Sequence, residues 1–143
     1  RDLARPAEKM SKSAPPGAGV LHLLDTPDVL RRTVARAVTD SAGSVAYDPD
    51  GRPGLANLLT VLAVCTGSTP ERLAGEYTRY GDLKRATADA VIATLAPVQA
   101  RYAELAADPG YVRDVLRDGA ARASAIAAPT VRAAREAIGL LAA

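Results

Sequence analysis

The chain has 143 residues, a formal net charge of +2, 48% hydrophobic residues and 24% charged residues. A chain of this size and composition can bury a substantial core, which excludes a mostly disordered protein and favours a single domain. Its aromatic residues are five tyrosines, so Leu, Val, Ile and Ala must build the core, and a large β-sandwich is disfavoured. A single cysteine, Cys65, excludes an internal disulfide framework, and a single histidine, His22, excludes a histidine-rich metal site.

Neither a membrane-spanning stretch nor a signal peptide is visible in the sequence. No run approaches the roughly 18 apolar residues that a membrane helix needs, and no secretory pattern opens the chain. The single cysteine fits a reducing compartment, so we expect a cytoplasmic protein with no membrane partner. A chain that begins with Arg1 instead of Met has the pattern of a processed product or a fragment.

Residues 1–25 contain no helical pattern. Residues 9–19 are rich in Pro, Gly and Ser and lack an apolar period, which is typical of a loop, and residues 20–24 form a short apolar run that favours an extended segment. Because residues 1–19 offer few apolar groups to bury, we expect them to form a flexible arm, the most mobile part of the chain.

The first helix is predicted from its start signal. Thr26, Pro27 and Asp28 supply a capping residue, a proline at the first helical position and a first-turn acid. We expect this helix to reach about Val38, with Leu30, Val34 and Val38 on one face.

A second helix follows a turn around residues 48–51. Leucines at positions 55, 58, 59 and 62 have the spacing of a buried helix face, and Gly67 has the place of a helix stop. Ser68 and Glu71 have the spacing of a capping box and predict the start of the next helix.

Prolines divide the rest of the chain into expected helices. The longest should run from about residue 82 to 107 with a kink at Pro97, another should begin at Pro109, and Pro129 should end it before a last helix. The expected apolar faces are Val91, Leu95, Val98, Tyr102 and Leu105; then Val112, Val115, Leu116, Ala123 and Ile126; then Val131, Ala134, Ile138 and Leu141. We therefore predict an all-α bundle of five or six helices over residues 26–143, preceded by a mobile loop and a short extended segment over residues 1–25.

Residues 9–13, the lysine loop, contain the side chains that best suit binding to phosphate. Their sequence, Lys9-Met10-Ser11-Lys12-Ser13, places two ammonium groups and two hydroxyls on one loop. Ammonium groups are compact charges that can follow a moving phosphate, and hydroxyls donate to phosphate oxygens. A solvated basic loop is the alternative for an arbitrary pentapeptide of this composition.

This pentapeptide resembles the signature loop of class I aminoacyl-tRNA synthetases, and the rest of the chain resembles the bacterial-type tryptophanyl branch of that class. The resemblance favours the tryptophanyl over the tyrosyl branch and covers essentially the whole chain in order. Its further segments are residues 23–25, 37–41, 47–49, 52–59, 81–84, 97–102 and 119–140.

The resemblance implies the C-terminal half of such an enzyme. The family builds its tryptophan and ATP sites mainly on an N-terminal nucleotide-binding sheet domain, which this chain lacks: it contains neither a Gly-rich strand–helix turn nor the family's histidine signature. The implied ligands are ATP with Mg²⁺, tryptophan and the tRNA for tryptophan, and the implied assembly is a homodimer. We expect the fragment alone to bind no cofactor or metal and to be inactive in tryptophan activation.

The resemblance also implies roles within the lysine loop, which in the family closes over ATP. By position, Lys12 would be the main contact to the leaving pyrophosphate and Lys9 a supporting one, while Ser11 and Ser13 would hold the closed loop or donate to phosphate. Met10 would be an apolar anchor. The family often has Asp after this pentapeptide, whereas residues 14–16 here are Ala-Pro-Pro, a departure that could change closure or nucleotide affinity.

A second basic cluster is the first choice for an RNA surface. Arg79, Tyr80, Lys84 and Arg85 could bind phosphate and stack a base, and the resemblance implies that the helical domain meets the tRNA anticodon. An ordinary solvated helix start is the competing interpretation.

Other basic groups are weaker candidates. Arg31, Arg32 and Arg36 form a basic strip on the first helix, whereas Arg113 and Arg117 fit a solvated face with neighbouring acids. A structural role as turn caps and buried hydrogen bonds is expected for Asp40, Ser41, Tyr47, Asp48 and Asn57.

Two classes of function remain at this point: part of a tryptophan–tRNA ligase, and a free-standing helical RNA-binding or regulatory module derived from one, without catalysis.

Overall fold

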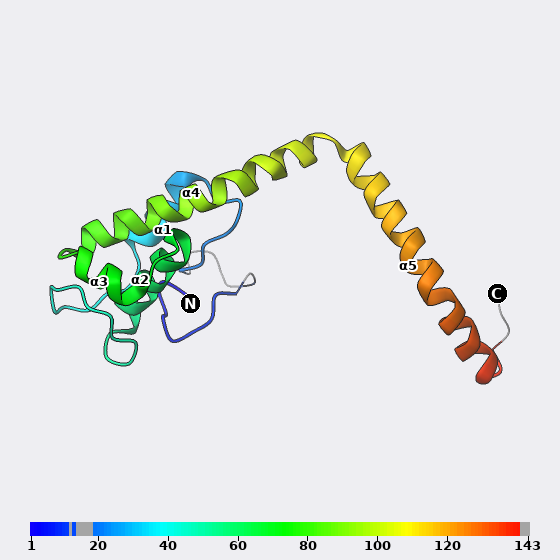
Figure 1. Ribbon diagram of the computed structural model, residues 1–143, viewed down its shortest axis with the longest axis horizontal. Helices are drawn as coiled ribbons and strands as arrows, with labels where there is room; N and C mark the ends of the chain where they lie inside the picture. The colour runs from blue at the N-terminus through cyan, green and yellow to red at the C-terminus, as the bar shows by residue number, and fades with distance from the viewer. Residues whose placement is uncertain (12, 14–18, 141–143) are drawn as a thin grey trace. The chain divides into compact units, whose positions relative to one another are not determined.

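The computed structural model of the protein describes residues 1–11, 13 and 19–140. Across these residues it contains five helices and no strand (Figure 1), which confirms the all-α prediction. The chain divides into two compact units, Arg1–Gln99 and Ala100–Ala143. None of the described helices is both long and apolar enough to cross a membrane.

Helix α1 spans Pro27–Ala35 and begins as the sequence predicts. The Thr26 hydroxyl accepts a hydrogen bond from the backbone N–H of Val29 at 3.4 Å, and Pro27 opens the helix. The helix ends before Val38, which was expected on its buried face and is instead 45% exposed. The Val38 N–H donates to the carbonyl of Leu3 at 2.8 Å, so this backbone leaves the helix to pair with the start of the chain.

Helix α2, Pro53–Thr66, is the centre of the first unit. Its four predicted core leucines, at positions 55, 58, 59 and 62, are at most 2% exposed. Gly67 ends the helix with a φ of 67°, in the left-handed region that favours glycine. Both predictions for this helix are confirmed.

Helix α3, Pro70–Glu76, starts one residue later than the predicted capping box. The cap is Thr69, whose hydroxyl accepts from the N–H of Arg72 at 3.3 Å. Thr69 takes this place because Pro70 is preorganised for the first helical position, which leaves Ser68 outside the cap.

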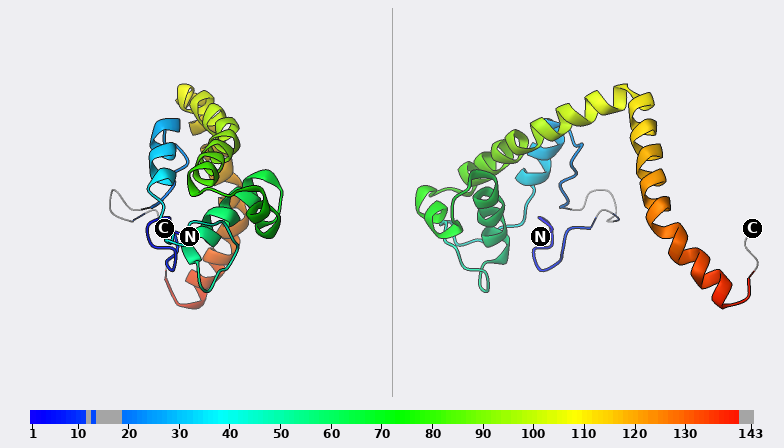
Figure 2. Two further views of the ribbon diagram at one scale, coloured as in Figure 1. Left: turned by 90° about the vertical axis from the view of Figure 1, so that its left-hand side faces the viewer. Right: turned by 45° about the vertical axis from the view of Figure 1, so that its right-hand side comes forward.

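Helix α4, Tyr80–Ala107, continues through Pro97 without a break in the helix. Only the first part of its predicted seam is buried: Val91 is 5% exposed, whereas Val98 and Tyr102 are about half exposed. The core of the first unit joins α1, α2, α3 and the start of α4 (Figures 1 and 2).

The second unit contains the end of α4 and helix α5, Pro109–Ala137. The Asp108 carboxylate caps α5 by accepting from the N–H of Tyr111 at 2.9 Å. The helix runs unbroken through Pro129, so the predicted break and separate last helix are wrong. No described residue of α5 is buried, and its expected apolar residues Leu116 and Ile126 are 66% and 80% exposed.

Candidate functional site

The described residues of the lysine loop lie at the surface of the first unit. Lys9 and Ser11 are exposed, and Met10 is half-buried and packs against the core. The Ser11 hydroxyl accepts from the N–H of Ser13 at 3.3 Å and so gives the loop a local turn. Lys12 and residues 14–18 lie outside the described residues, and the roles expected for Lys12 and for the Ala-Pro-Pro stretch stay predictions.

The chain before the lysine loop is anchored, which differs from the flexible arm expected for residues 1–19. Asp2 and Leu3 are only 1% and 2% exposed. The Leu3 N–H donates to the Gly19 carbonyl at 2.8 Å, and the Leu3 carbonyl accepts from the N–H of Val38. Residues 2–4 and Gly19 therefore form a hydrogen-bonded base from which the lysine loop projects. Sequence reasoning missed this base because a single leucine gives no periodic signal.

Asp2 organises the base through its side chain. Its Oδ1 accepts backbone N–H bonds from Ala4 at 2.8 Å and Arg5 at 3.0 Å. Burial raises the pKa of this carboxyl, but these hydrogen bonds and the Arg5 guanidinium outweigh burial and bring the pKa below its ordinary value of 3.8. The carboxylate therefore stays ionised and holds the turn that follows it.

Asn57, on α2, joins the base to the core helix. Its Oδ1 accepts from the terminal ammonium of Arg1 at 3.0 Å, and its Nδ2 donates to the carbonyls of Arg1 at 3.1 Å and Asp2 at 3.5 Å. The side chain is 7% exposed. This geometry agrees with the structural role expected for Asn57.

A hollow of about 520 Å³ lies beside the lysine loop, lined by Arg1, Ala7, Lys9 and Met10. The Arg1 guanidinium donates to the Ala7 carbonyl at 2.9 Å and so borders the same space as Lys9. Among the described residues, the lining contains two cations, Arg1 and Lys9, and no carboxylate, which gives this part of the hollow a positive character that suits an anionic ligand.

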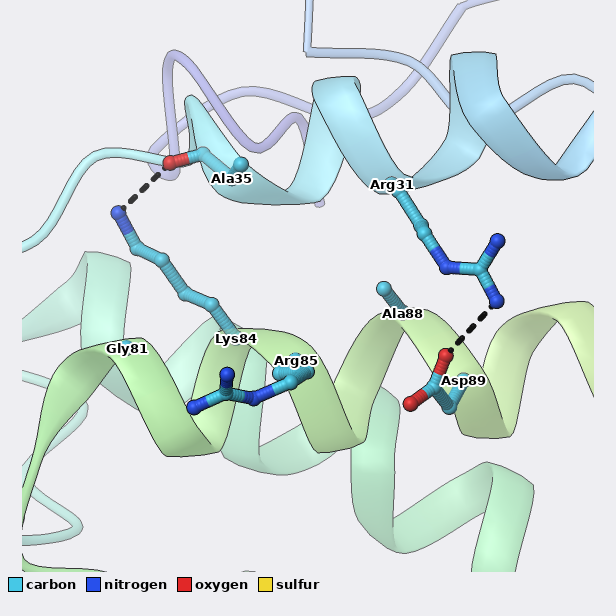
Figure 3. A pocket seen from close by; sticks show the side chains of 7 residues that line it. All are labelled: Arg31, Ala35, Gly81, Lys84, Arg85, Ala88 and Asp89. Carbon is cyan, nitrogen blue, oxygen red and sulfur yellow. Dashed lines mark hydrogen bonds and ion pairs between the residues drawn. The ribbon is translucent and has the colours of Figure 1, made fainter.

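In the second basic cluster, Lys84 and Tyr80 bind groups of the protein itself, whereas Arg79 and Arg85 are exposed. Lys84 Nζ donates to the carbonyl of Ala35 at 3.1 Å (Figure 3). It also donates to the carbonyl of Ala37 at 2.8 Å. It thereby binds the C-terminal end of α1, where cations are favoured, and partial burial lowers the pKa of its ammonium.

The Tyr80 side chain also hydrogen-bonds other residues of the protein. Its hydroxyl donates to the Asp40 carboxylate and accepts from Arg52 at 2.7 Å, while Arg52 Nε donates to Asp40 at 2.7 Å. The Arg52 guanidinium, and after it the Tyr80 hydroxyl, hold the pKa of the Asp40 carboxyl well below 3.8. The other two members of the cluster, Arg79 and Arg85, are exposed.

A second hollow of about 400 Å³ lies between α1 and α4. Arg31, Lys84, Arg85 and Asp89 contribute its charged lining (Figure 3). The Arg31 guanidinium pairs with Asp89 at 3.2 Å, so one cation of the predicted basic strip is neutralised. Arg32 and Arg36 are exposed.

Comparison with known proteins gives one consistent result. The model of the family "tRNA synthetases class I (W and Y)" matches residues 1–96. Tryptophan–tRNA ligase 1 of Streptomyces coelicolor is 57% identical over 140 residues, which cover 98% of this chain and 42% of that protein. The tryptophan–tRNA ligase of Leifsonia xyli is 43% identical over 142 residues, which cover 98% of this chain and 42% of that protein.

A solved structure matches over the same extent. The crystal structure of tryptophanyl-tRNA synthetase from Mycoplasma pneumoniae aligns with a TM-score of 0.78 and 25% sequence identity, covering 99% of this chain and 45% of that one. The chain thus spans less than half the length of the relatives that it matches.

Proposed function

Because the chain belongs to the class I tRNA synthetases for tryptophan and tyrosine, we propose that it supplies the lysine loop and the helical region of a tryptophan–tRNA ligase. The observation that carries the proposal is a similarity to such ligases that runs through 98% of the chain, lysine loop included. We place the chain in the C-terminal part of the ligase, with the pockets for tryptophan and adenine in the part of the relatives that it does not span.

The reaction assigned to the whole ligase is activation of tryptophan by ATP. The tryptophan carboxylate attacks the α-phosphate, the bond between the α- and β-phosphates breaks, and pyrophosphate leaves. Mg²⁺ bound with ATP would neutralise part of the charge on the phosphates. The tryptophanyl group then passes from the adenylate to a hydroxyl of the tRNA, and AMP leaves. As in the family, the assembled ligase would be a cytoplasmic homodimer.

Negative charge grows on the pyrophosphate as it leaves, so a cation placed there binds the transition state more tightly than it binds ATP. We assign this role to Lys12 and a supporting role to Lys9. Two features support the assignment: Lys9 borders a hollow whose described lining includes a second cation, Arg1, and the Leu3 N–H donates to the Gly19 carbonyl, which joins the chain before the loop to the chain after it.

For tRNA, the exposed members of the second basic cluster are the better candidates. Arg79 and Arg85 are exposed, although Arg85 shares its charge with Asp82 through a hydrogen-bonded ion pair. Lys84 and Tyr80 already have partners inside the protein. We therefore propose that Arg79 and Arg85 make the phosphate contacts, and that Lys84 and Tyr80 hold the surface in place.

A segment exchange tests the proposal. In this chimaera the chain replaces the matching segment of the Streptomyces coelicolor ligase, and tryptophan-dependent exchange of pyrophosphate into ATP and charging of tRNA are measured. We expect both activities in the chimaera and neither in the isolated chain. A folded chimaera without exchange, together with RNA binding by the isolated chain, would instead support a free-standing RNA-binding module.

A further inference from the structure

We propose that one face of α5 is a docking surface for the part of the tryptophan–tRNA ligase that this chain does not span, an inference that rests on the proposed function. The occupant is a folded segment of the same polypeptide that covers the helix with bulky apolar side chains. The surface, the α5 face, consists of the side chains that share one side of the first half of the helix: Val112, Val115, Leu116, Gly119, Ala123 and Ile126.

The sequence of α5 separates apolar from charged residues. The members of the α5 face recur at steps of three and four, the spacing that places side chains on one side of an α-helix. Most charged residues of the same stretch lie on the other side: Arg113, Asp114, Arg117 and Asp118. Arg122 is the exception and lies at the edge of the α5 face. This is the pattern of a helix that packs one side against the apolar surface of a protein.

The second unit does not bury this face by itself. None of its described residues, 100–140, is buried, and the side chains of Leu116 and Ile126 keep 66% and 80% of their surface exposed. Ordering a helix costs conformational entropy, which burial of an apolar face normally offsets, and most isolated helices are marginal in water. The described part of the unit therefore lacks a core of its own, and the cover for the α5 face must come from elsewhere.

The length of the relatives points to the source of this cover. The chain spans 42% of the Streptomyces coelicolor ligase, so more than half of that protein lies outside the matched region. The match covers 98% of this chain and therefore includes α5, as does the match to the Mycoplasma pneumoniae structure, which covers 99% of this chain. A segment of more than half a ligase is large enough to fold around its own core and to present an apolar surface to α5.

The composition of the α5 face favours this occupant over α5 of a second copy. Two identical helices pair stably when large apolar side chains fill nearly every position of the seam between them. Here the middle of the face is formed by Gly119 and Ala123, which would leave gaps in such a pair. The small side chains between Leu116 and Ile126 instead leave room for larger side chains of a different surface, as close packing requires.

Cysteine labelling tests whether the α5 face is covered. Ile126→Cys is introduced into the isolated chain and into the chimaera, and its alkylation by a maleimide is followed by mass spectrometry of the peptide that contains it. We expect the reaction to be at least about tenfold slower in the chimaera, because the docked helix must open locally before it reacts. The matched control is Ser124→Cys, on the opposite side of the same turn, whose rates in the two proteins should agree within about twofold. Val115→Cys provides a second position on the α5 face.

Photo-crosslinking identifies what covers the face. With a benzophenone-bearing amino acid in place of Ile126, the crosslinked peptide in the chimaera should come from the part of the Streptomyces coelicolor ligase that this chain does not replace. A crosslink to α5 of a second copy would overturn the proposal in favour of a helix pair. A crosslink to residues 1–99, or slow labelling of Ile126→Cys already in the isolated chain, would overturn it as well.

The activity of the chimaera separates this proposal from the proposed function. If the chimaera forms the adenylate but its Ile126→Cys and Val115→Cys variants react as fast as those of the isolated chain, the docking surface is overturned and the proposed function stands. If a folded chimaera protects both positions and gives the expected crosslink but forms no adenylate, the docking surface is supported and the proposed function is overturned.

Discussion

The Asp40 carboxylate joins the loop between α1 and α2 to the starts of two helices. Arg52 precedes α2 and Tyr80 opens α4, and both hydrogen-bond the same carboxylate. Arg52, and after it Tyr80, lower the pKa of Asp40, so the ionised form is favoured in the folded protein. The network therefore stabilises the fold only while Asp40 is charged.

The lowered pKa of Asp40 predicts the direction in which its contribution to stability changes with pH. Because the folded pKa lies below 3.8, the contribution of Asp40 is fully present above pH 3.8 and is lost as the pH falls from there through the folded pKa. The difference in unfolding free energy between the natural protein and Asp40→Asn should thus be largest near neutral pH and shrink on acidification. Urea unfolding over a pH series measures it, and a difference that does not change with pH would contradict the account.

Lys84 provides a second test at the level of one side chain. Replacing it with Met removes the donations to Ala35 and Ala37 and should lower the unfolding free energy by about 1–2 kcal/mol, since carbonyls at a helix end lose a charged partner. The matched control is Arg85→Met, whose exposed partner is Asp82 and whose effect should stay within about 0.5 kcal/mol. Urea unfolding gives both free energies from the transition midpoints, provided that the variants keep the same dependence on urea concentration. Equal losses for the two variants would rule out a role of Lys84 in capping α1.

Among the helices, α2 shows what sequence pattern can predict. Its leucine spacing and its glycine stop are local features of the chain, and the structure confirms both. The break predicted at Pro129 failed for a physical reason: a proline removes one N–H from the helix, but the alanine-rich sequence on both sides favours helix strongly enough to continue. A proline therefore marks a possible helix end and does not decide it.

Two glycines, one just after α2 and one within α3, give opposite predictions for substitution by alanine. Gly67 has a φ of 67°, whereas Gly75 lies within α3, with open space where a Cβ would be. Gly67→Ala should lower the unfolding free energy by about 1 kcal/mol because alanine is strained in the left-handed region. Gly75→Ala should raise it by up to about 1 kcal/mol through helix propensity. Thermal or urea unfolding of both variants is the measurement, and a destabilisation of similar size at the two sites would refute the conformational argument.

For the whole molecule, the family could be predicted from sequence because ordered motifs run along the entire chain, and the comparisons confirm it. The long-range hydrogen bonds of particular side chains could not be predicted from the sequence. Asn57 and Lys84 reach partners 47 to 56 positions away, and no local pattern encodes such contacts. The same limit explains why residues 2–4 were assigned to a free arm.

The central claim is that the lysine loop acts on the leaving pyrophosphate, and Lys12 tests it most directly. Lys9→Ala should lower the rate less than Lys12→Ala, because we propose only a supporting role for Lys9. Lys12→Arg should rescue only partly because a planar guanidinium cannot replace a point donor.

The measurement is the pre-steady-state rate of adenylate formation in the chimaera at saturating ATP. We expect Lys12→Ala to lower this rate by about 10²–10³-fold, as the loss of a charged donor to a transition state does, with a smaller effect on ATP affinity. If Lys12→Ala raises only the ATP dissociation constant and leaves the rate intact, the loop merely grips the nucleotide and the claim is wrong.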